Sequence, residues 1–490
     1  MPTPPHAISR LADRLPPWAA GLSGGCILII VAGLIAAPIA LTGGTRASSA
    51  MQLWLFAATH EILYQPMVDE WNADAEARGA LPIEMSMLGL APLQRRVMSG
   101  FYGGLPTADL VEIERTMAGQ VFSGPVEAVG LVDLTDRMRD AGMFDKFPET
   151  SLSPWTSRGR VFGIPHDVHP LLLGVRADLV EGAGISLDNI ETWDDFARTL
   201  APMMRDDNND GDPDRYLLGF WPTQTEKVEI LLLQGGTGLF DENGALTLVS
   251  EANARVLATM VSWCVGPNRI AADVKDFEAS GNKLKTDGFA LAFFMPDWMC
   301  NVWKNELPHM AGTLEIMPLP AFEPGGRRVS VWGGTMLGIP KTSQNIDAAW
   351  DAAQHLYFDS EFARELYRAG DIITPINTYW ADPVFDEPDD YFRGQAKGRL
   401  YIEHIPGIPA RNASPYNQTA VFRVADAAMA LIDYANDNAL YTPAELEAEA
   451  MNQLQAAERA ILRVMNRNAF AQAEPAEADT AESGTRGGGQ

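Results

Sequence analysis

A run of acidic and amide side chains at residues 206–214 (DDNNDGDPD) is the most conspicuous polar feature of the sequence. Its spacing follows a calcium-binding loop of the EF-hand type, in which Asp206, Asn208, Asp210 and Asp214 would supply the ligands. Position 12 of that pattern calls for a bidentate carboxylate, and Leu217 occupies it. The run therefore predicts either a structural calcium site or a solvated turn rich in aspartate and asparagine.

Two tryptophans stand beside groups that suit the binding of a small polar molecule. Trp332 is followed by Gly333 and Gly334, and glycine lets the backbone approach a ligand closely. Asp297 and Trp298 directly follow a strand-like apolar run, which places an acceptor and an aromatic ring at one strand end. Such a pairing suits a sugar, because the apolar face of the ring can stack on tryptophan while its hydroxyls donate to a carboxylate. Packing in the core is the alternative for both rings.

Further polar and aromatic residues follow other strand-like runs. Ligands of open α/β sheets lie at the carboxyl ends of the strands, so these residues are also candidates for ligand binding. They are Thr59, His60, Glu114, Asp167, His169, Trp221 and Gln224. A lone histidine is more often structural than functional, and this alternative stays open for His60 and His169.

Alternating strands and helices would position these residues. The N-terminal part of the folded chain reads as a strand at 52–56, a helix at 61–78, and strands at 83–87 and 107–113. This alternation builds a mostly parallel sheet covered on both faces, so the predicted fold class is α/β. Later strand-like runs are 161–165, 171–175, 289–294 and 336–339, and later helical runs are 192–204, 251–263, 346–357, 361–369 and 442–465. The last of these runs has one apolar face and begins with a capping box, in which Thr442 is the N-cap and Glu445 the capping glutamate.

Length and charge narrow the class of protein. A chain of 490 residues exceeds what one hydrophobic core usually organises, which predicts two lobes or domains. The formal net charge is -27, with 64 acidic and 37 basic residues, and such a surface repels phosphate backbones. We therefore expect no nucleic-acid partner. The charge indicates either a solvated surface or an acidic pocket for a cationic ligand.

Cysteine usage leaves one question open. Cys264 and Cys300 are the two cysteines of the folded part, and they would form either a disulfide or two buried free thiols. The sequence contains no cluster of cysteine and histidine that would bind zinc. We expect no cofactor other than the calcium considered above.

The N-terminus carries a membrane-directed segment. No charged residue lies between Arg14 and Arg46, and positive charge before an apolar run predicts that the rest of the chain is exported. Residues 18–41 are long enough to span a bilayer of about 30 Å, and residues 48–50 (SSA) offer small side chains for a signal peptidase. We expect residues 1–50 to be either a cleaved signal peptide or an inner-membrane anchor, and the remainder to be periplasmic.

Several segments together resemble a known family. The segment 331–345 (VWGGTMLGIPKTSQN), followed by Ala348-Ala349-Trp350, resembles the stretch typical of family 1 extracellular solute-binding proteins, the receptors of carbohydrate ABC importers. Similar segments occur in the expected order before it, at 163–165 (GIP), 176–180 (RADLV), 192–196 (TWDDF) and 234–244 (QGGTGLFDENG). The resemblance covers about residues 51–465.

The resemblance implies a two-lobed periplasmic binding protein of the type II-like class. Two α/β lobes are joined by crossing segments, ligand is held in the cleft, and the lobes close around it by hinge motion. The expected boundaries are 51–165 and 288–343 for the first lobe and 166–287 and 344–470 for the second, with a disordered tail at 471–490. The family places ligand contacts at Trp332, Gly333 and Gly334.

The function that the resemblance implies is the capture of a sugar or sugar derivative and its delivery to ABC permease subunits in the inner membrane. We expect a monomer. A receptor for a cationic ligand such as a polyamine, gripped by carboxylates beside aromatic walls, is one alternative. An exported carbohydrate hydrolase would need two carboxylates about 5–10 Å apart across the scissile bond. The sequence has no GxSxG or HExxH motif and singles out no carboxylate pair, so we do not expect an enzyme.

Overall fold

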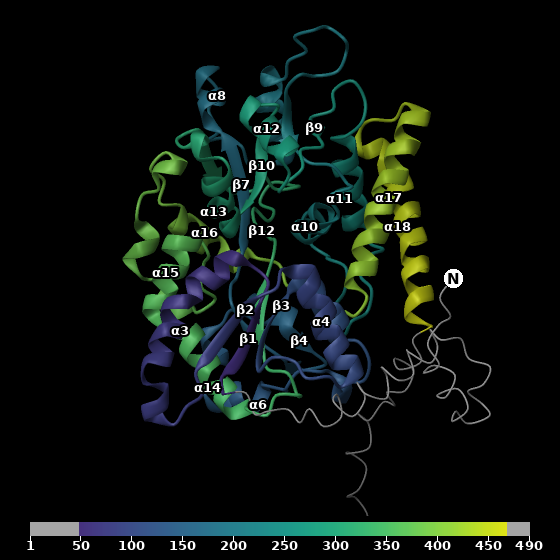
Figure 1. Ribbon diagram of the computed structural model, residues 1–490. Coiled ribbons are helices and arrows are strands. Elements are labelled where there is room, and N and C mark those ends of the chain that lie inside the picture. The colour runs from purple at the N-terminus through teal and green to yellow at the C-terminus, as the bar shows by residue number, and fades with distance from the viewer. Residues whose placement is uncertain (1–48, 468–490) are drawn as a thin grey trace, which may run out of the picture. The chain divides into compact units, whose positions relative to one another are not determined.

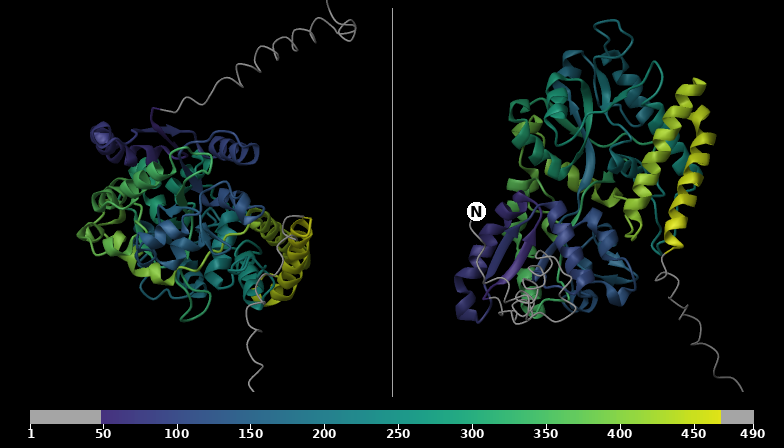
Figure 2. Two further views of the ribbon diagram at one scale, coloured as in Figure 1. Left: turned by 90° about the horizontal axis from the view of Figure 1, so that it is seen from below. Right: turned by 45° about the vertical axis from the view of Figure 1, so that its right-hand side comes forward.

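Two main sheets, each covered by helices, make up the part of the chain that the structure describes, residues 49–467 (Figures 1 and 2). The structure is a computed structural model. No helix within these residues is long and apolar enough to cross a membrane. The predicted signal peptide or membrane anchor at 18–41 and the predicted tail at 471–490 lie outside the described residues.

The first lobe is built on a five-stranded sheet. The strand order is β2 (Ile83–Met87), β1 (Met51–Leu55), β3 (Leu110–Glu114), β13 (Thr335–Gly338) and β6 (Ile164–Pro165). β1 is parallel to β2 and β3, whereas β13 is antiparallel to β3 and β6. The parallel part agrees with the sheet predicted from the sequence.

Helices cover both faces of this sheet. Side chains alternate along a strand, so Leu53 and Leu55 face one core and Trp54 faces the other. The first core includes α3 (Ala58–Arg78) and α14 (Ile346–Tyr357), and the second includes α4 (Leu90–Gly103) and α5 (Arg115–Val121). The lobe also contains α6 (Thr135–Asp140), α7 (Glu149–Leu152), the hairpin of β4 (Thr156–Ser157) and β5 (Arg160–Val161), and α15 (Ser360–Gly370).

The second lobe is built on a six-stranded sheet. Its order is β11 (Leu314–Met317), β7 (Pro170–Arg176), β10 (Ala290–Pro296), β8 (Tyr216–Gly219) and β9 (Ala271–Ala272), and β12 (Ser330–Val331) also pairs with β7. Every residue of β7 and β10 is buried, because helices cover the sheet on both faces. These helices are α8 (Ala177–Gly182), α9 (Trp193–Leu200), α10 (Thr225–Gly235), α11 (Glu251–Ser262), α12 (Ala279–Asp287), α13 (Asp297–Glu306) and α16 (Lys397–His404).

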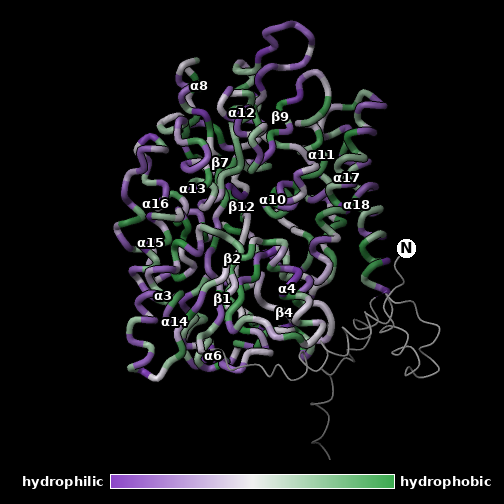
Figure 3. The backbone as a smooth tube through the Cα atoms, in the orientation of Figure 1, coloured by the Kyte–Doolittle hydropathy of each residue, from purple (hydrophilic) through white to green (hydrophobic). Residues whose placement is uncertain are grey.

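Two long C-terminal helices lie side by side along one flank of the second lobe (Figures 1 and 2). They are α17 (Asn417–Asn438) and α18 (Pro443–Met465). Hydrophobic and hydrophilic positions alternate along both (Figure 3), as expected of helices with one buried face. The capping box that the sequence predicts at the start of α18 is present, since Thr442 and Glu445 cap each other's backbone N–H.

The lobes divide the chain differently from the expected boundaries. β10 was expected in the first lobe, but it pairs with β7 and β8 in the second sheet. α14 was expected in the second lobe, but it packs in the first core beside α3. A short apolar strand has the same pattern in either sheet, and the strands that pair with it are distant in sequence. The sequence pattern therefore could not assign β10 to a lobe.

The two cysteines of the described chain are free and buried. Of the two alternatives that the sequence leaves open, the structure shows the free thiols. Cys264 belongs to the second-lobe core, and Cys300 lies in α13 beside the hydroxyl of Tyr401.

A glycine in α12 tests the packing beside the second-lobe sheet. A Cβ atom at Gly281 would lie 1.8 Å from the carbonyl oxygen of Lys275, so Gly281→Ala should lower the free energy of unfolding by about 1–3 kcal/mol. Gly182 has no heavy atom within 4 Å of the same position, and Gly182→Ala should leave stability unchanged or raise it slightly. Urea unfolding of both variants measures the difference, and equal stability of the two would contradict this packing.

Candidate functional site

A cavity of about 390 Å³ lies between the two lobes. It is lined by the ends of first-lobe elements, among them the start of α3 and the end of β3, and by α10, α13 and the turn after β12 in the second lobe. Eight of the residues predicted to bind ligand line it. They are Thr59, His60, Glu114, His169, Trp298, Trp332, Gly333 and Gly334.

Two tryptophans form a fixed aromatic wall of the cavity. The rings of Trp298 and Trp332 meet edge to face, with centroids 5.5 Å apart. Trp298 Nε1 donates to the carbonyl oxygen of Trp332 at 2.9 Å, and Trp332 Nε1 donates to Glu226 Oε2 at 2.6 Å. These hydrogen bonds satisfy both indole N–H groups and set the ring orientations. Trp332 is only 6% exposed, so it serves the second-lobe core as well as the cavity wall.

Phe277 extends this wall at an exposed position. Its ring is nearly parallel to that of Trp298, at 8° and 6.1 Å between centroids, and the residue is 57% exposed. Its backbone is left-handed, with φ 61°, a conformation that non-glycine residues adopt at a cost. The neighbouring Asp276 holds the segment by ion pairs to the buried Lys227 and Lys285. Sequence reasoning missed Phe277, because it follows no strand and belongs to no periodic pattern.

Two carboxylates face the cavity from opposite lobes. Glu114, in the first lobe, caps α5 and accepts hydrogen bonds from the backbone N–H and hydroxyl of Thr116. Glu226, in the first turn of α10, belongs to the second lobe. Burial raises the pKa of Glu114, and the charge of Glu226 raises it further. Sequence reasoning identified Glu114 and missed Glu226, which no strand end marks.

Two predicted site residues support the cavity from behind without lining it. Asp297 is fully buried, and its carboxylate accepts hydrogen bonds from the backbone N–H of Trp298 and of Ile373 at 2.8 and 2.7 Å. It also accepts from His169 Nδ1 at 2.7 Å. Asp167 accepts from the other nitrogen of His169 at 3.0 Å. Both aspartates therefore hold His169 and nearby backbone N–H groups in place, and neither lines the cavity.

His169 is held between these two carboxylates as a cation. Burial alone would lower the pKa of His169, but Asp167 and Asp297 outweigh burial and raise the pKa to about 10. The same ion pairs hold the pKa of Asp167 well below its usual range, although burial opposes this. His169 has a left-handed backbone, with φ 44°. These contacts fit the structural alternative that the sequence leaves open for this histidine.

Two further predicted site residues lie away from the cavity. Trp221 is half-buried against the second-lobe core. The Gln224 amide donates to Asp273 Oδ1 and to the carbonyl oxygen of Val274. β8 ends at Gly219, and these residues hold the neighbouring loop instead of facing the cavity.

The acidic run forms an exposed turn. The Asp206 carboxylate accepts hydrogen bonds from the backbone N–H of Asp210 and Gly211, and Asn208 Oδ1 also accepts from Asp210 N–H. Asp214 accepts from the backbone N–H of Asp207. Between residues 49 and 467, no three histidine, cysteine, aspartate or glutamate side chains are grouped to hold a metal ion. The run is thus described as a hydrogen-bonded turn, one of the two alternatives that the sequence leaves open.

The sequence is similar to known binding proteins. The profile of the family described as bacterial extracellular solute-binding protein matches residues 103–361, more than half of the chain. The chain is 24% identical to an arabinooligosaccharide-binding protein of Halalkalibacterium halodurans over 375 residues, which are 74% of this chain and 80% of that protein. It is 25% identical to a lactose-binding protein of Rhizobium radiobacter over 335 residues, which are 65% of this chain and 73% of that protein.

The fold is similar to solved structures of the same kind. An ABC substrate-binding protein of Listeria monocytogenes in complex with cycloalternan superposes with a TM-score of 0.64 at 14% identity, covering 85% of this chain and 99% of that one. The sugar-binding protein MalE of Xanthomonas citri has a TM-score of 0.64 at 15% identity, covering 84% and 99%.

The ion pairs of His169 predict a pH-dependent stability. The pKa of His169 is raised on folding, so its contribution is complete below the unfolded-state value of about 6.5 and is lost as the pH rises through about 10. His169→Asn, which tolerates a left-handed backbone, should cost about 3–5 kcal/mol near pH 6. That difference from the unsubstituted protein should shrink toward pH 10.

Urea unfolding across this pH range measures the effect. His309 is exposed, and His309→Asn is the matched control, which should cost little at any pH. A cost for His169→Asn that does not change between pH 6 and pH 10 would contradict the buried cation.

Proposed function

Because the chain belongs to the bacterial extracellular solute-binding protein family, we propose that it is the receptor of an ABC importer and binds a neutral saccharide in the cavity between its lobes. As a member of a family of binding proteins, the chain is not an enzyme. Members of this family act outside the cytoplasm, and the membrane-directed segment at 18–41 agrees with that location.

The observation that carries the proposal is the pairing of an aromatic wall with carboxylates from both lobes. Trp298 offers a ring on which the apolar face of a sugar can stack, and its orientation is fixed before ligand arrives. Glu114 and Glu226 offer acceptors for sugar hydroxyls from the two sides of the cavity. A ligand that donates to both carboxylates would favour the closed arrangement of the lobes.

The charged groups that line the cavity are engaged by partners within the protein. Arg115 and Arg411 are both paired with the buried Glu229, which lies behind the lining. The charge of His169 is taken up by the aspartates on either side of it. The two carboxylates of the lining, those of Glu114 and Glu226, already accept hydrogen bonds from neutral donors, as they would from sugar hydroxyls. The binding of arabinooligosaccharide and lactose by similar proteins supports a saccharide as well.

Delivery to the permease would follow from hinge motion. The chain passes between the lobes at 166–169, between β6 and β7, at 332–334, between β12 and β13, and again between α15 and α16. Such crossing segments absorb the rotation by which lobes close around a ligand. A permease in the inner membrane would then recognise the closed form of a monomeric receptor. Residues 18–41 would act as a signal peptide or keep the receptor at the membrane.

Replacing Trp298 tests this function. Trp298→Ala should weaken saccharide binding about tenfold or more, because it removes the stacking surface, and should change stability less than it changes affinity. Trp221→Ala is the matched control, since Trp221 packs on the same lobe away from the cavity and its loss should leave affinity unchanged.

Calorimetric titration with arabino-oligosaccharides, lactose and spermidine provides the measurement, together with thermal unfolding of each variant. Saturable binding of a saccharide without its turnover is the expected result. Binding of spermidine alone, or an equal loss of affinity in both tryptophan variants, would contradict the proposed function.

A further inference from the structure

A buried charge cluster joins the two lobes at one side of the cavity. Glu229 of α10 accepts hydrogen bonds from the guanidinium groups of Arg115 and Arg411 at 2.6 and 2.5 Å, and from the side-chain amide of Asn417 at 3.2 Å. Arg115 belongs to the first lobe, whereas Glu229 belongs to the second. All three charged residues are at most 7% exposed. The Arg115–Glu229 pair therefore exists only when the lobes are together.

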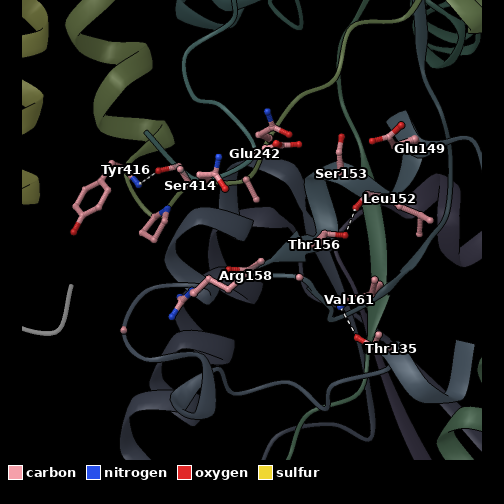
Figure 4. A pocket seen from close by; sticks show the side chains of 18 of the residues that line it. Thr135, Glu149, Leu152, Ser153, Thr156, Arg158, Val161, Glu242, Ser414 and Tyr416 are labelled. Carbon is pink, nitrogen blue, oxygen red and sulfur yellow. Dashed lines mark hydrogen bonds between the residues drawn. The ribbon is translucent and has the colours of Figure 1, made fainter. Parts of the chain in front are cut away.

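A second, larger depression between the same lobes lies beyond this cluster. It has a volume of about 900 Å³, and Figure 4 shows Ser153 and Glu149 of the first lobe facing it together with Glu242 and Ser414 of the second. Arg411 lines the cavity and donates from Nη1 to the carbonyl oxygen of Gly333, whereas its backbone N–H donates to Ser153 Oγ, which lines the depression. The charge cluster thus stands between the two spaces.

The cluster is held firmly in its charged form. Burial would raise the pKa of Glu229, but Arg115 and Arg411 outweigh it and lower the pKa to about 2. Burial and the charge of Arg411 lower the pKa of Arg115 to about 10, which still leaves it a cation at neutral pH. Next to it, the carbonyl oxygen of Ser414 would lie 2.6 Å from a Cβ atom at Gly119, so the backbone around the cluster is closely packed.

We propose that the cluster of Arg115, Glu229 and Arg411 closes one end of the ligand cavity and restricts this receptor to short saccharides. This inference rests on the proposed function. The cavity is near the lower end of the roughly 300–1,000 Å³ of typical ligand sites. A longer saccharide would have to occupy the place where Arg115 meets Glu229, and the lobes could not close with that ion pair formed. Without this ion pair, the last sugar residues of a longer saccharide would reach the depression.

One substitution removes the barrier without leaving a buried charge unpaired. The cluster has two guanidinium groups for one carboxylate, so Arg115→Ala leaves Glu229 paired with Arg411. Arg115→Lys keeps the charge at the same position, although it gives up the planar fork of hydrogen bonds. Arg139→Ala is the matched control, because Arg139 lines the depression from the first lobe in an exposed ion pair with Asp136.

Calorimetric titration of the full-length protein with the series from arabinose to arabinopentaose tests the barrier. In the unsubstituted protein, affinity should rise over the first members and then stay within about twofold. In Arg115→Ala, arabinopentaose should bind about tenfold more tightly than arabinotriose, whereas Arg115→Lys and Arg139→Ala should keep the plateau.

The outcomes separate the barrier from the proposed function. An affinity that keeps rising to arabinopentaose in the unsubstituted protein would overturn the barrier and leave the saccharide receptor intact, whether or not any variant folds. An unchanged plateau in a folded Arg115→Ala would overturn it too. Failure of the unsubstituted protein to bind any member of this series or lactose would overturn the proposed function, and the barrier with it.

Discussion

A carboxylate without exposed surface must be surrounded by donors, and those of Asp297 come from three separate parts of the chain. The N–H of Trp298 belongs to α13, that of Ile373 follows α15, and His169 belongs to the crossing between β6 and β7. Asp297 therefore fixes where the end of β10 meets two segments that run toward the first lobe. Since Trp298 is the next residue, the position of the aromatic wall depends on the same carboxylate.

Two sets of buried charges have different places in the fold. The set around His169 joins crossing segments that stay together whenever the chain is folded. The Arg115–Glu229 pair joins the lobes themselves, so hinge opening must separate it and expose both groups to water. The first set thus contributes to the stability of the folded chain in every arrangement of the lobes, whereas the second set helps to determine how the lobes fit together when they close. Because Arg115 of the second set lines the ligand cavity, a ligand must leave room for the Arg115–Glu229 pair if the lobes are to close.

Structure that depends on residues close in sequence could be predicted, whereas structure that depends on pairing between distant segments could not. The capping residues and apolar face of α18 were readable because helix signals lie within a few residues of one another. The lobe to which β10 belongs could not be predicted, since the strands that pair with β10 are distant in sequence. At the site, the strand-end rule found Glu114 and Trp298 but gave no signal for Phe277, Glu226 or Arg411, which reach the cavity from loops and a helix start.

A crystal structure of the protein with a bound arabino-oligosaccharide would show directly whether the ligand lies in the cavity between the lobes. We expect a sugar ring against the face of Trp298, hydroxyls within hydrogen-bond distance of Glu114 and Glu226, and an intact pair of Arg115 and Glu229 at the end of the ligand. Saccharide bound only in the depression beside Ser414, with the cavity free of it at saturating concentration, would contradict this binding site.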